Sequence, residues 1–136
     1  MIAIDCARFC GDGRACCTET EMTLTHEDAK RITALGYSKS DYLVRVTAGF
    51  CELKNVDGHC FFYDSDSMMC KIYEARPDGC RWYPVIYDAR KRKCIVDDEC
   101  PAAGTVARNR VRKVSHKVRR LVESLRQEAA HGESPC

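Results

Sequence analysis

The feature that most constrains this chain is a run of four cysteines within twelve residues near its start: Cys6, Cys10, Cys16 and Cys17. Glycine and charged residues separate these thiols, so the segment is poorly suited to a hydrophobic core. Such spacing lets the backbone curl until several sulfurs point at one centre, as in metal–thiolate sites. Side chains of adjacent residues diverge, so Cys16 and Cys17 either serve two centres or comprise one ligand and one packing or reactive thiol.

Eleven of the 136 residues are cysteine, a proportion that allows either a disulfide framework or metal–thiolate sites. A secreted disulfide scaffold normally carries a signal peptide and an even number of cysteines. Here the count is odd, and the opening MIAIDC contains neither a basic segment nor a long apolar run. We therefore expect metal-bound thiolates in a reducing, cytoplasmic setting, with disulfides as the alternative. No stretch approaches the run of about 20 apolar residues that a membrane span requires, so we expect no membrane partner.

One helix is predicted in the N-terminal half of the chain. Thr25 is its expected N-cap, followed by acidic residues in the first turn. Ala29, Ile32 and Leu35 supply an apolar face, and Gly36 is the expected residue after the C-terminus.

Two β-hairpins are also predicted. The first turns at 56–58, where Asp-Gly separates two strand-like runs. The second joins 85–87 to 94–96 across a charged turn. The pattern of segment 41–46 does not separate helix from strand.

The last segment, 103–130, is predicted to be a long amphipathic helix, with apolar residues recurring every three or four positions. The basic residues offered to a partner on its other face are Arg110, Arg112, Lys113, Lys117, Arg119 and Arg120. Three roles stay open for this helix: packing on its own domain, pairing with a second copy, or binding RNA or an acidic protein. The formal net charge of the whole chain is only +2, which makes no general case for a nucleic-acid partner.

The segments before this helix carry further motifs around cysteines. These are Leu24-Thr25-x-x-Asp28, Cys60-Phe61-Phe62, Cys70-Lys71-Ile72-Tyr73, Arg76-Pro77-Asp78-Gly79-Cys80-Arg81-x-Tyr83-Pro84 and Cys100-Pro101. With them the chain resembles the YkgJ-type cysteine-cluster family, whose members are described as zinc- or iron-chelating domains with a CxxCxxxxCC motif. The resemblance covers about residues 6–101. The first motif departs from the family pattern, because it has one extra residue in each gap.

The resemblance implies a set of eight metal-binding cysteines. They are Cys6, Cys10, Cys16, Cys17, Cys60, Cys70, Cys80 and Cys100. Cys51, Cys94 and Cys136 fall outside the set. We expect Cys51 and Cys94 to be core residues, because they lie in apolar, strand-like runs, and Cys136 to be an exposed spare thiol.

Eight thiols suffice for two four-cysteine sites, or for one cluster with additional packing or exchange thiols. Structural zinc sites usually contain two CxxC units, and this sequence contains no CxxC unit. An iron–sulfur cluster (4Fe–4S) is therefore the favoured cofactor, with zinc as the alternative.

These observations predict a small, irregular α+β domain in which metal replaces much of the core, with short hairpins and the two helices described above. Residues 1–102 would form the metal-binding domain, 103–130 the basic helix packed on it or on a partner, and 131–136 a tail.

The favoured function is a small cluster-bearing electron-transfer, carrier or accessory module with a protein or redox partner. One alternative, implied by the resemblance through flagellin lysine-N-methylases, is a cluster-dependent enzyme related to lysine N-methyl transfer. The other is a structural zinc adaptor that binds protein or RNA through the basic helix. The sequence identifies no catalytic residue and no glycine-rich cofactor loop, and it leaves the oligomeric state open.

Overall fold

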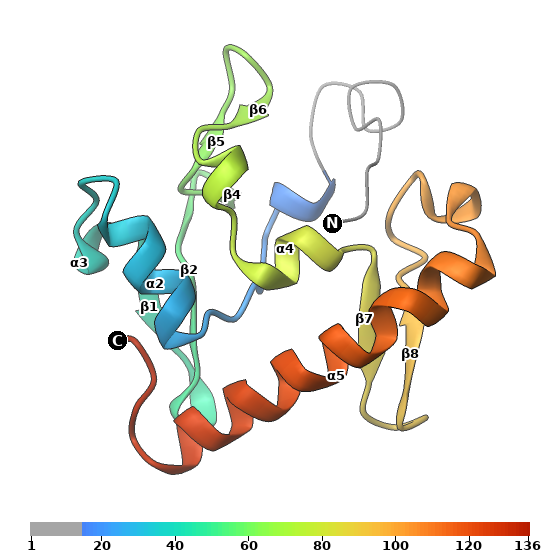
Figure 1. The fold of residues 1–136 in the computed structure, drawn as a ribbon. Coiled ribbons are helices and arrows are strands. Elements are labelled where there is room, and N and C mark those ends of the chain that lie inside the picture. Colours follow the sequence, from blue (N-terminus) through green and yellow to red (C-terminus); the bar gives the residue numbers. More distant parts are fainter. Residues whose placement is uncertain (1–14) are drawn as a thin grey trace.

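The computed structural model describes residues 15–136, and Figure 1 shows how their helices and strands are arranged. In this part of the chain, short helices alternate with pairs of strands, and a long helix follows them. This arrangement confirms the predicted small α+β fold. The helices are α2 (His26–Thr33), α3 (Lys39–Tyr42), α4 (Asp78–Trp82) and α5 (Arg108–Ala130). The 3₁₀ turns are η1 (Ala15–Cys17), η2 (Thr47–Gly49), η3 (Tyr73–Ala75) and η4 (Ala103–Thr105).

The strands of the described chain form separate antiparallel pairs. They are β1 (Leu43–Arg45) with β2 (Cys51–Leu53), β3 (Asn55–Val56) with β4 (His59–Cys60), β5 (Tyr63–Asp64) with β6 (Met69–Cys70), and β7 (Val85–Asp88) with β8 (Lys93–Val96). The β3–β4 and β7–β8 hairpins confirm the two predicted turns. Asp57 and Gly58 have φ values of 51° and 81°, the left-handed conformation that a type I′ turn requires. Two-stranded sheets are marginal alone, so these pairs depend on tertiary packing.

Helix α2 begins as predicted, with Thr25 as its N-cap. The Thr25 hydroxyl accepts a hydrogen bond from the Asp28 backbone N–H (3.1 Å), and the Asp28 carboxylate accepts one from the Thr25 N–H (3.0 Å). Together these bonds form a capping box. Ala29 and Ile32 are buried as expected, but Leu35 is 55% exposed. The expectation for Leu35 was wrong because α2 ends at Thr33, so the helical period no longer sets the direction of its side chain.

A first core lies between α2 and the strands β1, β2 and β4. Its buried members are Leu24, Ala29, Ile32, Tyr42, Leu43, Cys51, Leu53, Cys60, Phe62 and Ile72. The ambiguous segment 41–46 divides here, because α3 ends at Tyr42 and β1 begins at Leu43. The Tyr42 hydroxyl donates to the Ala29 carbonyl (3.1 Å), which ties the end of α3 to α2.

A second core joins α5 to the β7–β8 hairpin. Val85, Val114 and Val118 are buried there, with Trp82 and Tyr87 packed against them. Helix α5 begins at Arg108 rather than 103, because residues 103–105 form the separate 3₁₀ turn η4, where the Thr105 hydroxyl donates to the Ala102 carbonyl (2.7 Å). The proposed division of the chain at residue 102 stays a prediction.

A disulfide joins Cys51 of β2 to Cys136, 85 residues later, with the two Cα atoms 5.9 Å apart. Cys51 is fully buried as expected, but the expectation that Cys136 is an exposed spare thiol was wrong. The reason is tertiary: α5 runs beneath the other elements and returns the last residues to β2 (Figure 1). Among the helices of residues 15–136, none is both long and apolar enough to cross a membrane.

Candidate metal centre

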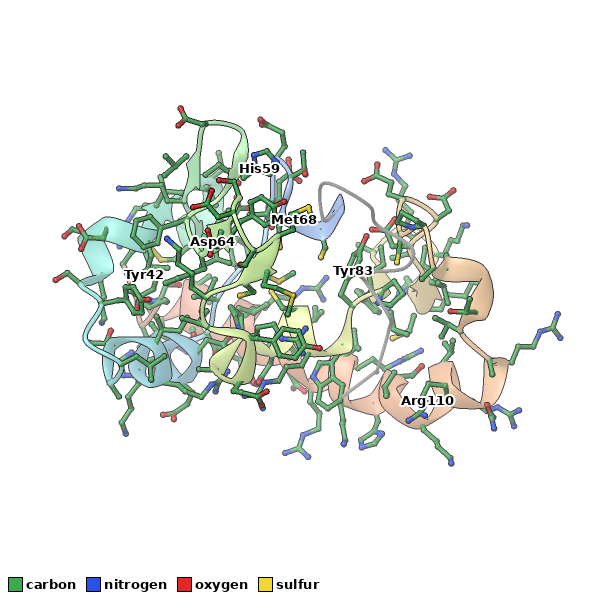
Figure 2. All side chains as sticks on the ribbon, turned by 90° about the horizontal axis from the view of Figure 1, so that it is seen from above. Tyr42, His59, Asp64, Met68, Tyr83 and Arg110 are labelled. Carbon is green, nitrogen blue, oxygen red and sulfur yellow. A yellow bond between two sulfur atoms is a disulfide. The ribbon has the colours of Figure 1, made fainter. Side chains whose placement is uncertain are left out.

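The predicted cysteine set divides between the described residues and the segment before them. Cys6 and Cys10 lie outside the described residues. The others lie on separate elements: Cys16 and Cys17 on η1, Cys60 on β4, Cys70 on β6, Cys80 on α4 and Cys100 after β8. Figure 2 shows side-chain sulfur atoms gathered near the centre of the molecule, between the labelled Met68 and Tyr83.

Backbone pairing brings these distant segments to one place. Thr18, next to η1, forms an antiparallel bridge with His59, which places η1 beside β4. Tyr63 pairs with Cys70, which places β6 beside the residues that follow β4. As a result, segments that are more than 40 residues apart in sequence contribute thiols to one region.

The thiols of this group influence one another's ionisation. The pKa of Cys17 is raised, first by its hydrogen bond with Cys16 and then by burial, with further contributions from Cys60 and Cys70. Burial raises the pKa of Cys80, and the neighbouring Cys16, Cys60 and Cys70 raise it further. Because adjacent thiolates repel one another, this group ionises readily only when a cation is present to balance the charge.

The backbone near Cys60 partly stabilises the thiolate form of this residue. Burial raises its pKa to about 11, but the backbone N–H groups of Phe62 and Tyr63 donate hydrogen bonds to its sulfur and act in the opposite direction. Hydrogen bonds to the charged form favour that form. The backbone after β4 is therefore arranged to receive a negatively charged sulfur.

Cys100 approaches the group from the side of Tyr83. Cys100 is buried, and both it and Cys16 lie within electrostatic range of the Tyr83 hydroxyl. That hydroxyl donates to the Asp97 carboxylate (3.0 Å), and burial is the main cause of its raised pKa. Tyr83 therefore lies close to Cys100 and, through its hydrogen bond, to Asp97 after β8.

The cysteines outside the predicted set bond elsewhere. Cys51 is in the disulfide, and the Cys94 thiol donates to the Ser115 carbonyl (3.5 Å) in the second core. Cys94 therefore offers a matched control for substitutions at the centre.

A buried carboxylate positions the segment that carries Cys80. Asp28 is 0% exposed, and its Oδ1 accepts the backbone N–H of Asp78 (3.0 Å) and the guanidinium of Arg31 (2.9 Å). Arg31 also donates to the Arg76 carbonyl (2.8 Å). These bonds fix the start of α4 against α2. Sequence reasoning assigned Asp28 to the first helix turn and to the Leu24-Thr25-x-x-Asp28 motif, but it missed Arg31. The available signal was the spacing of three residues between Asp28, at the third helical position, and Arg31.

Positive charge also lies close to the thiols. The charge of Arg76 lowers the pKa of Cys80, opposing the effect of burial. The Arg76 guanidinium lies over the Tyr73 ring, 3.8 Å from its centroid, and Nε donates to the Tyr73 carbonyl (2.8 Å). An arginine held in this way partly balances a negatively charged metal–thiolate centre.

The donor chemistry fits zinc or iron, because thiolates are the preferred ligands of both structural zinc and iron–sulfur clusters. Within residues 15–136, however, no three or more Cys, His, Asp or Glu side chains are yet arranged so that they could hold a metal ion. Two of the predicted thiols lie outside these residues. The eight-cysteine ligand set therefore stays a prediction.

Comparisons with known proteins bear on the same region. The family model CxxCxxCC, described as "Putative zinc- or iron-chelating domain", matches residues 5–102. An uncharacterized protein of Methanocaldococcus jannaschii is 36% identical over 99 residues. That match covers 68% of this chain and 50% of the relative, so the chain spans half of the relative's length. No solved structure matches the chain.

Proposed function

Because this chain belongs to the CxxCxxCC family of zinc- or iron-chelating domains, we propose that it carries an iron–sulfur cluster and acts as a small electron-transfer, carrier or accessory module. The observation that carries the proposal is the convergence of η1, β4, β6 and α4, which brings Cys16, Cys60 and Cys70 into electrostatic range of both Cys17 and Cys80. Such a group is costly to ionise without a cation, which favours metal binding over isolated structural thiols.

The thiols proposed to hold the metal are Cys16, Cys17, Cys60, Cys70 and Cys80, with Cys6, Cys10 and Cys100 completing the set. When bound, a cluster of this kind supplies a one-electron redox centre. The protein's own residues bind and tune it: the N–H groups after Cys60 stabilise its thiolate, and Arg76 offsets negative charge near Cys80. Cys100 is buried and Cys80 is partly buried, which limits access of water to their sulfurs.

Iron is favoured over zinc because the ligands come from widely separated single cysteines and one adjacent pair. Zinc knuckles place two ligands three positions apart on one tight turn, and the sequence has no CxxC unit. Zinc in four-cysteine sites is the alternative, in which case the centre is structural and the module is an adaptor.

Anaerobic purification, an absorption spectrum and elemental analysis test this proposal directly. We expect brown protein containing iron and acid-labile sulfide in similar amounts. Cys80→Ser should lose most of the metal, whereas the control Cys94→Ser should keep it, because Cys94 lies in the second core. Colourless protein with stoichiometric zinc would exclude the iron–sulfur cluster and support the zinc alternative. Protein without metal, or equal metal in both variants, would overturn the centre itself.

The proposed setting is the cytoplasm, where thiols stay available to metal. The Cys51–Cys136 disulfide provides a check, because such bonds are rare in reducing compartments. Rapid alkylation of thiols at cell lysis, followed by mass spectrometry, should find Cys51 and Cys136 reduced in the cell and bridged only after air oxidation. A disulfide already present at lysis would contradict the cytoplasmic setting while leaving the metal proposal intact.

A further inference from the structure

The structure concentrates positive charge on helix α5 and on the turn between β7 and β8. Residues 108–122 of α5 contain seven Lys or Arg and no Asp or Glu, and the turn 89–93 contains four Lys or Arg and no acid. Together they hold half of the chain's 22 basic residues. We define the basic surface as these eleven residues together with Arg126. All of them are exposed: Arg90, Lys91, Arg92, Lys93, Arg108, Arg110, Arg112, Lys113, Lys117, Arg119, Arg120 and Arg126.

Packing of α5 decides which way these side chains face. Val114 and Val118 are buried against the β7–β8 hairpin, with Val111 beside them. Residues on the opposite side of a helix of 3.6 residues per turn must then face outward. Figure 2 shows the labelled Arg110 among nitrogen-tipped side chains that extend away from α5.

The arginines along one side of α5 lie next to the β7–β8 hairpin. Arg112, Arg119 and Arg126 are seven residues apart, so they follow one line along the helix, and Arg108 extends the line by a turn. The hairpin lies along this line, because Arg126 lies over the Tyr87 ring (5.7 Å to its centroid) and the Cys94 thiol reaches the Ser115 carbonyl. The line from Arg108 to Arg126 is about 27 Å long.

The hairpin turn presents its four basic residues on an ordered backbone. The Asp88 carboxylate accepts the backbone N–H groups of Arg90 (2.9 Å) and Lys91 (3.0 Å), which closes the turn. The β7–β8 hairpin projects past α5 (Figure 1), so its turn continues the charge of the helix beyond the helix edge.

Acidic side chains lie at two places beside the basic surface. Asp88 interacts with Arg90 and Lys91 in the turn. Glu27, Asp78 and Glu128 line a hollow together with Lys117 and Arg120. In residues 15–136 the salt bridges join Arg31 and Arg81 to Asp28 and Asp78, and none involves the basic surface. The large apolar side chains that are exposed, such as Val44 and Met69, also lie elsewhere. A protein interface would need a buried apolar or aromatic centre, and membrane insertion would need apolar side chains, so a polyanion fits this surface better.

We propose that the basic surface binds the phosphodiester backbone of a nucleic acid. Arginine is suited to this role because its planar guanidinium pairs with two phosphate oxygens at once. Binding of this type is independent of base sequence and depends strongly on salt, because each phosphate contact releases a counterion. This function is separate from the metal centre, so either proposal can fail without the other.

Fluorescence anisotropy on the full chain tests the proposal, using 20-nucleotide single-stranded RNA, single-stranded DNA of the same sequence and duplex DNA. We expect binding that weakens at least tenfold between 50 and 200 mM KCl, since several contacts are made. The RNA and DNA arms identify which nucleic acid is preferred. Absence of binding to all three would overturn the proposal, as would equal affinity for anionic lipid vesicles or for polyglutamate.

Paired variants locate the surface. Arg112→Gln with Arg119→Gln should weaken single-strand binding about tenfold or more and reduce the slope of log affinity against log salt by about 1.4, at about 0.7 per lost contact. Lys91→Gln with Arg92→Gln should act in the same direction. Lys30→Gln with Lys39→Gln removes the same charge from exposed positions on α2 and α3 and should change neither quantity. An equal loss in this control would overturn the assignment to α5 and the turn.

Discussion

At the scale of single residues, the buried carboxylate of Asp28 holds helix α4 against helix α2. Asp28 has no exposure, yet both of its carboxylate oxygens are used, by the Thr25 N–H, the Asp78 N–H and Arg31. A buried carboxylate is tolerated only when its hydrogen bonds are satisfied and its charge is paired. This requirement makes the joint between α2 and α4 specific.

We expect Asp28→Asn to lower the free energy of unfolding by about 2 to 4 kcal/mol, because it removes the charge that pairs with Arg31 and places an N–H₂ group among donors. Urea denaturation followed by circular dichroism measures this loss. Glu27→Gln, at an exposed position in the same turn, is the control and should change stability little. Similar effects of the two substitutions would show that Asp28 does not organise the joint.

Ionisation of the thiols leads to a prediction about pH. The pKa of Cys60 is raised to about 11, so this thiol is protonated at neutral pH and must lose its proton when metal binds. Protons therefore compete with the metal below this pKa, and metal affinity should rise as the pH rises from 6 to 9. Competition with a chromophoric chelator at several pH values, corrected for the chelator's own protonation, measures the trend. A flat dependence would exclude protonated thiols as ligands.

At the scale of elements, α5 and its tail connect parts of the molecule that are distant in sequence. The helix packs on the β7–β8 hairpin, and the Cys51–Cys136 disulfide then attaches its far end to β2. The Arg45 guanidinium also donates to the Cys136 carbonyl. The disulfide closes a loop of 85 residues and so reduces the conformational freedom of the unfolded chain.

We expect Cys136→Ser to lower the free energy of unfolding of the oxidised protein by about 4.5 kcal/mol, the loss predicted for opening a loop of this length. Metal content should not change, because neither bridged cysteine belongs to the centre. Wild-type protein treated with dithiothreitol should unfold at the same denaturant concentration as the variant. If dithiothreitol left the wild-type midpoint unchanged, the disulfide would not contribute to stability.

At the scale of the whole molecule, two small hydrophobic cores stabilise the fold. The first core contains Cys60 and packs against Cys17 and Cys70, so it borders the proposed centre. The second core, of Val85, Val114 and Val118, contains none of the proposed ligands. Small hydrophobic cores supply little net stability, which makes the metal a substantial part of the balance.

Removal of metal should therefore affect the two cores differently. We expect chelation to lower the melting temperature and to abolish amide hydrogen-exchange protection in β2–β6, while amides near Val114 and Val118 stay protected longer. Hydrogen exchange read by mass spectrometry, before and after verified metal removal, distinguishes these regions. An unchanged melting curve would contradict a stabilising metal, and uniform loss of protection would show that the two cores unfold as one unit.

Local sequence patterns were sufficient for several elements. The Thr25 N-cap, the Asp57-Gly58 turn and the β7–β8 hairpin were predictable because each depends on backbone preferences of neighbouring residues. The family was also predictable, since closely spaced motifs identify it without a fold. The predicted burial of Leu35 and the predicted start of α5 at residue 103 were wrong. Helix ends depend on competing local hydrogen bonds and on packing, which a periodic pattern does not report.

The sequence alone determined the thiol chemistry, the family and the local turns and caps, because these follow from residue type and short spacing. Only the tertiary structure decided that η1, β4, β6 and α4 bring their thiols together, that Asp28 and Arg31 anchor α4, and that Cys136 pairs with Cys51. It also placed the β7–β8 turn beside the arginines of α5. These relations join residues that are tens of positions apart, and their distances depend on how the cores pack rather than on any local preference.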